Sequence, residues 1–169
     1  MLMADVFSIT LSILGFFLAL QGVWLLCLAL WPRGVARAQA IEQDQPLRAV
    51  FVGAPLTLGV FLVAVMSSQV GGPAQAFGFA LLAGWLLFAS VGVAGFASLI
   101  GERLASPVDE RRPWRRTVRG GAVLELAFLF PILGWFLLLP IVLVMGTGAA
   151  ALGLRKQREA PAADLQGAR

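Results

Sequence analysis

The sequence predicts an all-α integral membrane protein, a bundle of transmembrane helices that forms one domain. Three observations predict it. First, 59% of the 169 residues are hydrophobic and 13% are charged, with a mean hydropathy of +0.87, whereas soluble domains are about 45–50% apolar and about 25% charged. Second, the charges gather in short segments between long apolar runs. Third, most runs are long enough to cross a hydrocarbon core of about 30 Å. We expect a single transmembrane domain over 1–154 and a flexible cytoplasmic tail over 155–169.

The first three apolar runs predict three spanning helices. Run 6–31 ends at Trp31-Pro32-Arg33, where an interfacial aromatic residue, a helix breaker and a charge follow one another. Because no basic residue precedes this run, we interpret it as a retained helix and not as a secretory signal. Run 49–66 contains Pro55, which predicts a kink. Run 76–100 carries no charge, which is typical of a spanning helix.

The last apolar stretch, 121–154, is too long for one ordinary span, because a straight helix of that length measures about 51 Å. We predict a helical hairpin with arms at about 121–133 and 135–154. The alternative is one long, tilted helix that leaves the bilayer. The fold prediction is therefore three spans plus a C-terminal hairpin, four to five membrane helices in all. The hairpin turn is expected at Pro131, Gly134 and Trp135.

The distribution of basic residues predicts the orientation of the helices. All 13 Lys and Arg lie in segments 32–48 and 101–120 and in the tail. Cytoplasmic loops of membrane proteins carry an excess of Lys and Arg. A hairpin puts all three basic segments on one side, whereas a single long helix would put the tail opposite the loops. We therefore expect a multi-pass protein of the bacterial inner membrane, with its N-terminus outside and its C-terminus in the cytoplasm.

Small residues recur at three- and four-residue spacing along three of the predicted helices. In lipid there is little hydrophobic drive between helices, and small residues favour association because they let backbones approach closely. We expect these stripes to pack on other helices, most simply within the chain, with a homodimer contact as the alternative for the first stripe. The predicted helix-packing residues are Ser8, Ser12, Gly15, Ala19 and Gly22, then Ala76, Ala80 and Gly84, and finally Gly146, Ala150 and Gly153.

One acid lies well inside an apolar segment. Ionisable residues at membrane depth are costly and therefore count as functional candidates, which makes Glu125 a candidate intramembrane polar site. The alternative is a structural carboxylate that reaches back to Arg119, Arg116 or water. Gln21, in the first helix, is predicted to form a hydrogen bond between helices.

A cluster of arginines around a tryptophan marks the second basic segment. Basic residues beside a membrane span attract anionic lipid headgroups by roughly 1 kcal/mol each. The alternative is an anchor for topology without a specific lipid. The predicted headgroup-binding residues are Arg111, Arg112, Trp114, Arg115 and Arg116.

Missing residue types exclude several kinds of chemistry. The chain has no His, no Tyr and one cysteine, Cys27, so the common ligand sets for zinc, haem or copper and a Ser-His-Asp triad cannot be assembled. Lys156, the one lysine, follows Arg155 and not a glycine, which excludes a P-loop. We therefore predict no catalytic residue, no metal and no cofactor, and a buried, inert Cys27. The net charge of +4 is explained by orientation in the membrane and not by nucleic-acid binding.

The order of several short motifs resembles a known membrane region. A basic loop leads to Arg48-Ala49 and Ala54-Pro55, a Gly-rich span ends in Gly101-Glu102-Arg103-Leu104, and a Pro-x-x-Gly-Trp hairpin leads to Arg155-Lys156. Over about 48–156 this is similar to the multi-helix membrane region that accompanies polymer-forming, bactofilin-type cytoskeletal domains of bacteria. The resemblance implies a membrane anchor beside an envelope-associated polymer. It transfers no catalytic residue, and the cytoskeletal β-helix domain is absent from these 169 residues.

Together these features favour a non-enzymatic membrane protein that acts as a scaffold or anchor for partner proteins. The expected contacts are the lipid bilayer, protein partners in the membrane or at its cytoplasmic face, and a second copy of the chain in a homo-oligomer. The alternative function is a small transporter or channel subunit. An effect of Glu125→Gln on a flux, with the fold intact, would favour transport.

Overall fold

The computed structural model describes residues 2–104, 112 and 114–167, and within these it does not describe the side chains of residues 2, 131 and 157–167. All regular structure in the described residues is helical, which confirms the all-α prediction. The elements are α1 (Leu2–Leu30), α2 (Pro32–Asp44), α3 (Pro46–Val70), α4 (Gly72–Arg103), α5 (Trp114–Phe128), α6 (Pro131–Leu133), a five-residue π-helix η2 (Gly134–Leu138) and α7 (Leu139–Gly167).

Four of the described helical segments are long and apolar enough to cross a membrane. Large apolar side chains such as Phe7, Phe51 and Phe79 are exposed along them. In water such surfaces would aggregate, whereas in a bilayer they face lipid. The chain is therefore a multi-pass membrane protein. The four segments are Met3–Leu30, Pro46–Val70, Gly72–Arg103 and Gly134–Lys156.

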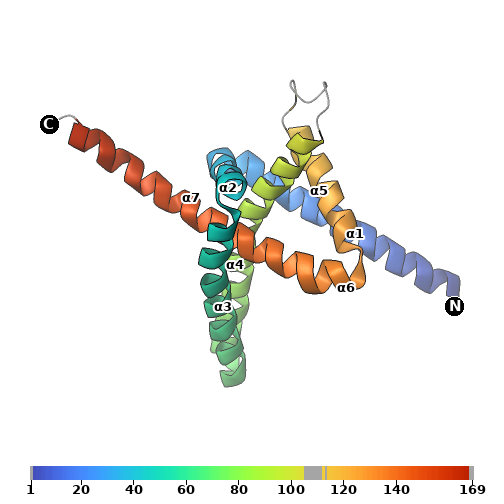
Figure 1. The fold of residues 1–169 in the computed structure, drawn as a ribbon. Coiled ribbons are helices and arrows are strands. Elements are labelled where there is room, and N and C mark those ends of the chain that lie inside the picture. The colour runs from blue at the N-terminus through green and yellow to red at the C-terminus, as the bar shows by residue number, and fades with distance from the viewer. Residues whose placement is uncertain (1, 105–111, 113, 168–169) are drawn as a thin grey trace.

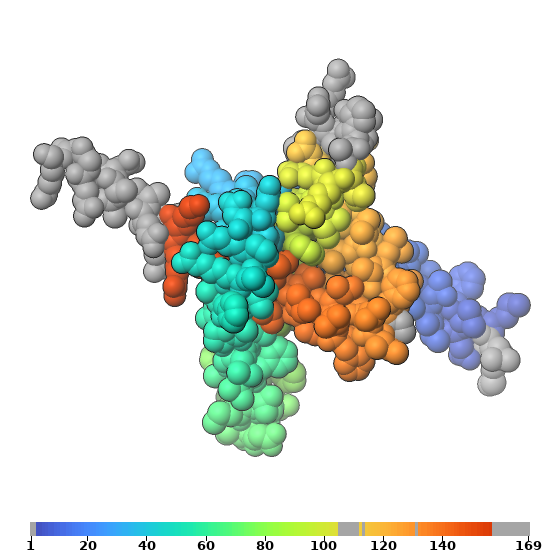
Figure 2. Space-filling model, viewed as in Figure 1, coloured from blue at the N-terminus to red at the C-terminus, as the bar shows by residue number. Residues whose placement is uncertain are grey.

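The long helices cross one another instead of lying in one parallel bundle. Helices α3 and α4 form a hairpin, and α7 passes across both (Figure 1). Gly71 and Gly72 form the turn between α3 and α4 with φ of 74° and 57°, backbone angles that glycine adopts without steric cost. The N-terminal half of α1 and the far end of the α3–α4 hairpin project from the centre (Figure 2). Of the four spans, α7 is the most buried and α1 the least.

Pairs of glycines hold α7 against the α3–α4 hairpin. Gly146 of α7 lies against Gly92 of α4, and Gly148 lies against Gly53 of α3. A Cβ atom at Gly92 would collide with the backbone of Gly146, and one at Gly53 would collide with the backbone of α7. The backbones of these helices therefore approach closely, as small residues at a helix–helix interface permit. The same arrangement joins α5 to α4, where Gly120 lies against Ala97 and Gly101.

The chain breaks and reverses between α5 and α7, as the hairpin prediction requires. The backbone N–H of Gly134 donates to the carbonyl of Phe130 at 2.7 Å. A Cβ at Gly134 would lie 2.7 Å from the carbonyl oxygen of Ala127, so only glycine fits inside this turn. Pro131 begins α6, and Trp135 is exposed on η2. The alternative of one continuous helix over 121–154 is wrong.

The predicted bounds of the first arm are also wrong. The arm α5 begins at Trp114, inside the segment expected to be a loop, and ends at Phe128 instead of 133. Its buried residues recur every three or four positions, so it is an amphipathic helix. Its arginines, Arg115, Arg116 and Arg119, made the segment resemble a loop. The buried residues are Thr117, Gly120, Gly121, Leu124, Glu125 and Phe128.

A second amphipathic helix, α2, replaces most of the loop expected over 32–48. Val35, Ala38 and Glu42 are its buried residues. They recur at helical spacing and face α4 and α7. Pro32 occupies the first turn of α2, where a missing N–H removes no hydrogen bond. In α3 the helix continues through Pro55 from Pro46 to Val70.

The three predicted small-residue stripes differ in whether they pack within the described chain. Gly146, Ala150 and Gly153 are buried on α7, as predicted. On α4 the prediction is wrong within the chain, because Ala76, Ala80 and Gly84 are exposed. The buried face of that half of α4 carries Gly78, Trp85 and Ala89 instead. On α1, a Cβ atom added at Gly15 or Gly22 would meet nothing within 4 Å, so this stripe does not pack within the described chain.

Candidate functional site

The stripe on α1 lies on the side of the helix that faces away from the bundle. At about 100° per residue, Ser8, Ser12, Gly15, Ala19 and Gly22 point roughly opposite to Gln21 and Trp24. Trp24, 2% exposed, belongs to the hydrophobic core. The Ser12 hydroxyl donates to the carbonyl of Ser8 at 2.8 Å, so its polar group is satisfied inside the helix. We call the five stripe residues the outer face of α1.

The inner side of α1 joins α5 through a polar contact. Gln21 donates from Nε2 to the carbonyl of Val118 at 3.0 Å and to Oε2 of Glu125 at 3.4 Å. A Cβ at Gly121 would lie 2.7 Å from Gln21 Oε1, so the missing side chain makes room for the amide. The predicted interhelical hydrogen bond of Gln21 is therefore confirmed. Glu125 is 6% exposed, and its contact with Gln21 acts as a bridge between two helices.

The described residues of the second basic segment lie mostly at the end of α4 and in the first half of α5. Arg116, expected as a partner of Glu125, forms an ion pair with Glu102 at 3.5 Å. The Arg115 guanidinium lies 5.6 Å from the centre of the Trp114 ring, in cation–π geometry. Trp114 and Arg112 are exposed, as headgroup contacts would be. Arg111 lies outside the described residues, and the binding of headgroups by this cluster stays a prediction.

A buried acid that the sequence did not single out lies on α2. Glu42 is 4% exposed, and neither of its carboxyl oxygens has a hydrogen-bond partner in the described chain. Burial raises the pKa of Glu42 to about 9, so the carboxyl group is protonated at pH 7. Ionising it there would put a charge without a hydrogen-bond partner in a buried position. The spacing of Glu42 from Val35 and Ala38 was the signal that could have identified it.

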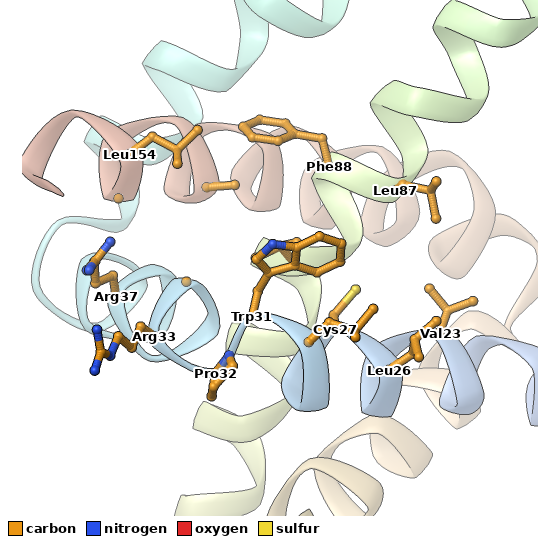
Figure 3. A pocket seen from close by; sticks show the side chains of 15 residues that line it. Val23, Leu26, Cys27, Trp31, Pro32, Arg33, Arg37, Leu87, Phe88 and Leu154 are labelled. Carbon is orange, nitrogen blue, oxygen red and sulfur yellow. The ribbon is translucent and has the colours of Figure 1, made fainter. Parts of the chain in front are cut away.

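A cavity of about 670 Å3 opens between α1, α2, α4 and α7. Its wall is mostly apolar and includes Cys27, which is buried as predicted. Figure 3 shows Arg33 and Arg37, both from α2, side by side at one end of the cavity. Val23 and Leu87 lie at the opposite end, with Trp31 between the two ends. The sequence did not predict this cavity, because four helices distant in the chain build it.

The described residues contain no group of three or more His, Cys, Asp or Glu side chains that could hold a metal ion. Their polar features include the Gln21–Glu125 contact, the isolated Glu42 and the arginine-lined end of the cavity. A comparison of the chain with protein-family models, curated proteins and solved structures found no match. The function is therefore inferred from these contacts and surfaces.

Proposed function

We propose that this protein is a scaffold or anchor in the bacterial inner membrane and that it binds a transmembrane helix of a partner protein along the outer face of α1. One observation carries the proposal. The outer face is a row of small residues, and Gly15 and Gly22 have nothing within 4 Å. A row of this kind without a partner among the described residues is a surface on which a second helix can approach closely.

The rest of the bundle supports this interpretation. At two close crossings of this chain a glycine lies on each side, at Gly92 with Gly146 and at Gly53 with Gly148. Gly15 and Gly22 present the same kind of surface at the lipid-facing side of the least buried span. The polar contact at Gln21 fixes the opposite side of α1 against α5. The orientation of the outer face is thus set by the bundle, as a scaffold requires.

The orientation that goes with this proposal puts the N-terminus outside and the basic segments in the cytoplasm. The N-terminus and the far end of α7 lie on opposite sides of the molecule (Figure 1), and all Lys and Arg follow the end of α1. We expect alkaline phosphatase fused after Arg169 to be inactive and a fluorescent protein fused there to be bright. Active phosphatase at that position would contradict the orientation.

A photo-crosslinking amino acid placed on each side of α1 tests the scaffold. We expect it to capture a protein partner in intact membranes when it replaces Ser12, on the outer face, and not when it replaces Thr10. The two sites are matched, because both residues are small, exposed and hydrogen-bonded to their own helix through a hydroxyl at 2.8 Å. The change Gly15→Leu should abolish the Ser12 crosslink, because the bulky side chain separates the backbones.

The masses of the crosslinked products distinguish the alternatives. A product of constant mass that contains a different membrane protein would support the scaffold. Crosslinks solely to a second copy of the chain would show a homo-oligomer instead. Equal capture from Ser12 and Thr10, or capture that survives Gly15→Leu, would contradict a specific contact along the outer face.

A further inference from the structure

We propose that the cavity between α1, α2, α4 and α7 is a binding site for an anionic phospholipid of the surrounding bilayer. One acyl chain would lie in the apolar part, and the phosphate would lie at the end formed by Arg33 and Arg37 (Figure 3). This inference does not depend on the scaffold function, because the cavity is lined on α1 by residues that come after Gly22, the last residue of the outer face: Val23, Leu26, Cys27 and Leu30.

The apolar part of the cavity is open to lipid. Leu26, Leu30 and Leu87 line it, and all three are more than half exposed. They belong to α1 and α4, two of the candidate membrane spans. A hydrocarbon chain can therefore enter sideways from the bilayer without crossing a polar barrier. Phe88 and Val91 of α4, which also line the cavity, provide further apolar surface.

The other end of the cavity has the chemistry that a phosphate group requires. Arg33 and Arg37 are one helical turn apart on α2, so both guanidinium groups lie on one side of that helix. The first turn of α2 borders the cavity through Pro32 and Gly34 and has no side-chain cap, so its backbone N–H groups add to the positive potential. Trp31 lies between this end and the apolar part. Tryptophan is enriched at the depth of the lipid headgroups, so this position fits a lipid whose phosphate lies near the two arginines.

The shape and the charge favour a lipid over a protein segment. A helix of a partner protein would be about 10 Å wide with its side chains. An acyl chain is narrower and needs no hydrogen-bond partners from the wall, which has few to offer. Basic pockets between transmembrane helices are a recognised setting for anionic headgroups.

Native mass spectrometry of the full-length protein in detergent tests the proposal. The probes are phosphatidylglycerol and phosphatidylcholine with identical acyl chains, so that they differ in headgroup charge alone. We expect one phosphatidylglycerol to bind at lower concentration than phosphatidylcholine. The double change Arg33→Gln/Arg37→Gln should weaken the binding of phosphatidylglycerol about 25-fold, or about fivefold for each arginine. It should leave phosphatidylcholine binding unchanged.

A matched control removes two arginines elsewhere. The variant Arg48→Gln/Arg103→Gln loses the same charge at two exposed positions outside the cavity and should keep the preference for phosphatidylglycerol. Glycerol phosphate, which has the phosphate without acyl chains, should not compete. If the double variant elutes differently from the wild type, Leu87→Trp replaces it, since a larger side chain in the cavity should weaken the binding of both lipids at this site.

Several results would overturn the proposal. One is equal binding of the two lipids by the wild type. Another is an equal loss of preference in the control variant, which would mean that surface charge alone attracts the lipid. Competition by glycerol phosphate would indicate a plain anion site. Unchanged binding in both Arg33→Gln/Arg37→Gln and Leu87→Trp would place the lipid elsewhere on the protein.

Discussion

The change Gly92→Ala is expected to lower the free energy of unfolding by about 3 kcal/mol, at the upper end of the range for overpacking a well-packed contact. The added methyl group would collide with the backbone of Gly146. Backbone cannot rotate away as a side chain can, so α4 and α7 must separate along their crossing. Loss of that contact also loosens α3, since α7 packs on α3 two residues further on, at Gly148.

The matched control for this experiment is Gly84→Ala in the same helix. Gly84 lies two turns earlier on α4 and has nothing within 4 Å. Alanine there should be neutral or raise the free energy of unfolding by up to about 1 kcal/mol, because it favours the helix over glycine. Unfolding in mixed micelles, followed by circular dichroism, measures both variants. Equal effects of the two changes would mean that helix propensity, and not the crossing at Gly146, governs the result.

The change Glu42→Gln is expected to remove a pH dependence of stability. Burial raises the pKa of Glu42 to about 9 in the folded protein, above the usual value of 4.5. Below pH 4.5 both the folded and the unfolded state are protonated at this group. Between about pH 4.5 and 9 the unfolded state loses the proton and the folded state keeps it, so the free energy of unfolding falls as pH rises. Above about pH 9 the folded state ionises as well and the fall ends.

The size of this effect follows from the two pKa values. Each pH unit in that window costs about 1.4 kcal/mol, so the wild type should lose up to about 3 kcal/mol between pH 5 and pH 7. Glutamine has nearly the same shape as the protonated acid, and both oxygens of Glu42 lack partners in the described chain. The Glu42→Gln variant should therefore match the wild type near pH 5 and exceed it at pH 7.

Unfolding curves at pH 5, 6 and 7 measure the effect of Glu42. The control is Asp44→Asn, which changes an exposed acid at the end of the same helix and should keep the pH dependence of the wild type. A Glu42→Gln variant that is less stable than the wild type at pH 7 would contradict a neutral, unpaired Glu42. It would show that the carboxylate is charged and has a partner in the folded protein.

The amino-acid sequence by itself determined the class of the protein, the position of the long apolar helices and the hairpin turn. Whether a segment crosses a bilayer depends on its length and hydropathy, which are local properties. The break at Gly134 also follows from local chemistry, because proline and glycine mark the turn. The polar segments that became α2 and α5 were interpreted as loops. Their helical spacing of buried residues was present in the sequence, but their arginines concealed it.

Only the tertiary structure decided which face of each apolar helix packs and which polar residues are buried. An apolar helix with glycine and alanine on several sides has no contrast in polarity to select a face. Ala76, Ala80 and Gly84 therefore looked as suitable as Gly78 and Ala89, and packing against α3 at Gly78 and against α7 at Ala89 selected the latter. The spacing on α2 puts Glu42 on the same face as Val35 and Ala38, but its lack of a hydrogen-bond partner and the arginine-lined cavity depend on contacts between helices distant in the chain. Such contacts depend on how all the helices pack together, and a local pattern in the sequence does not contain that information.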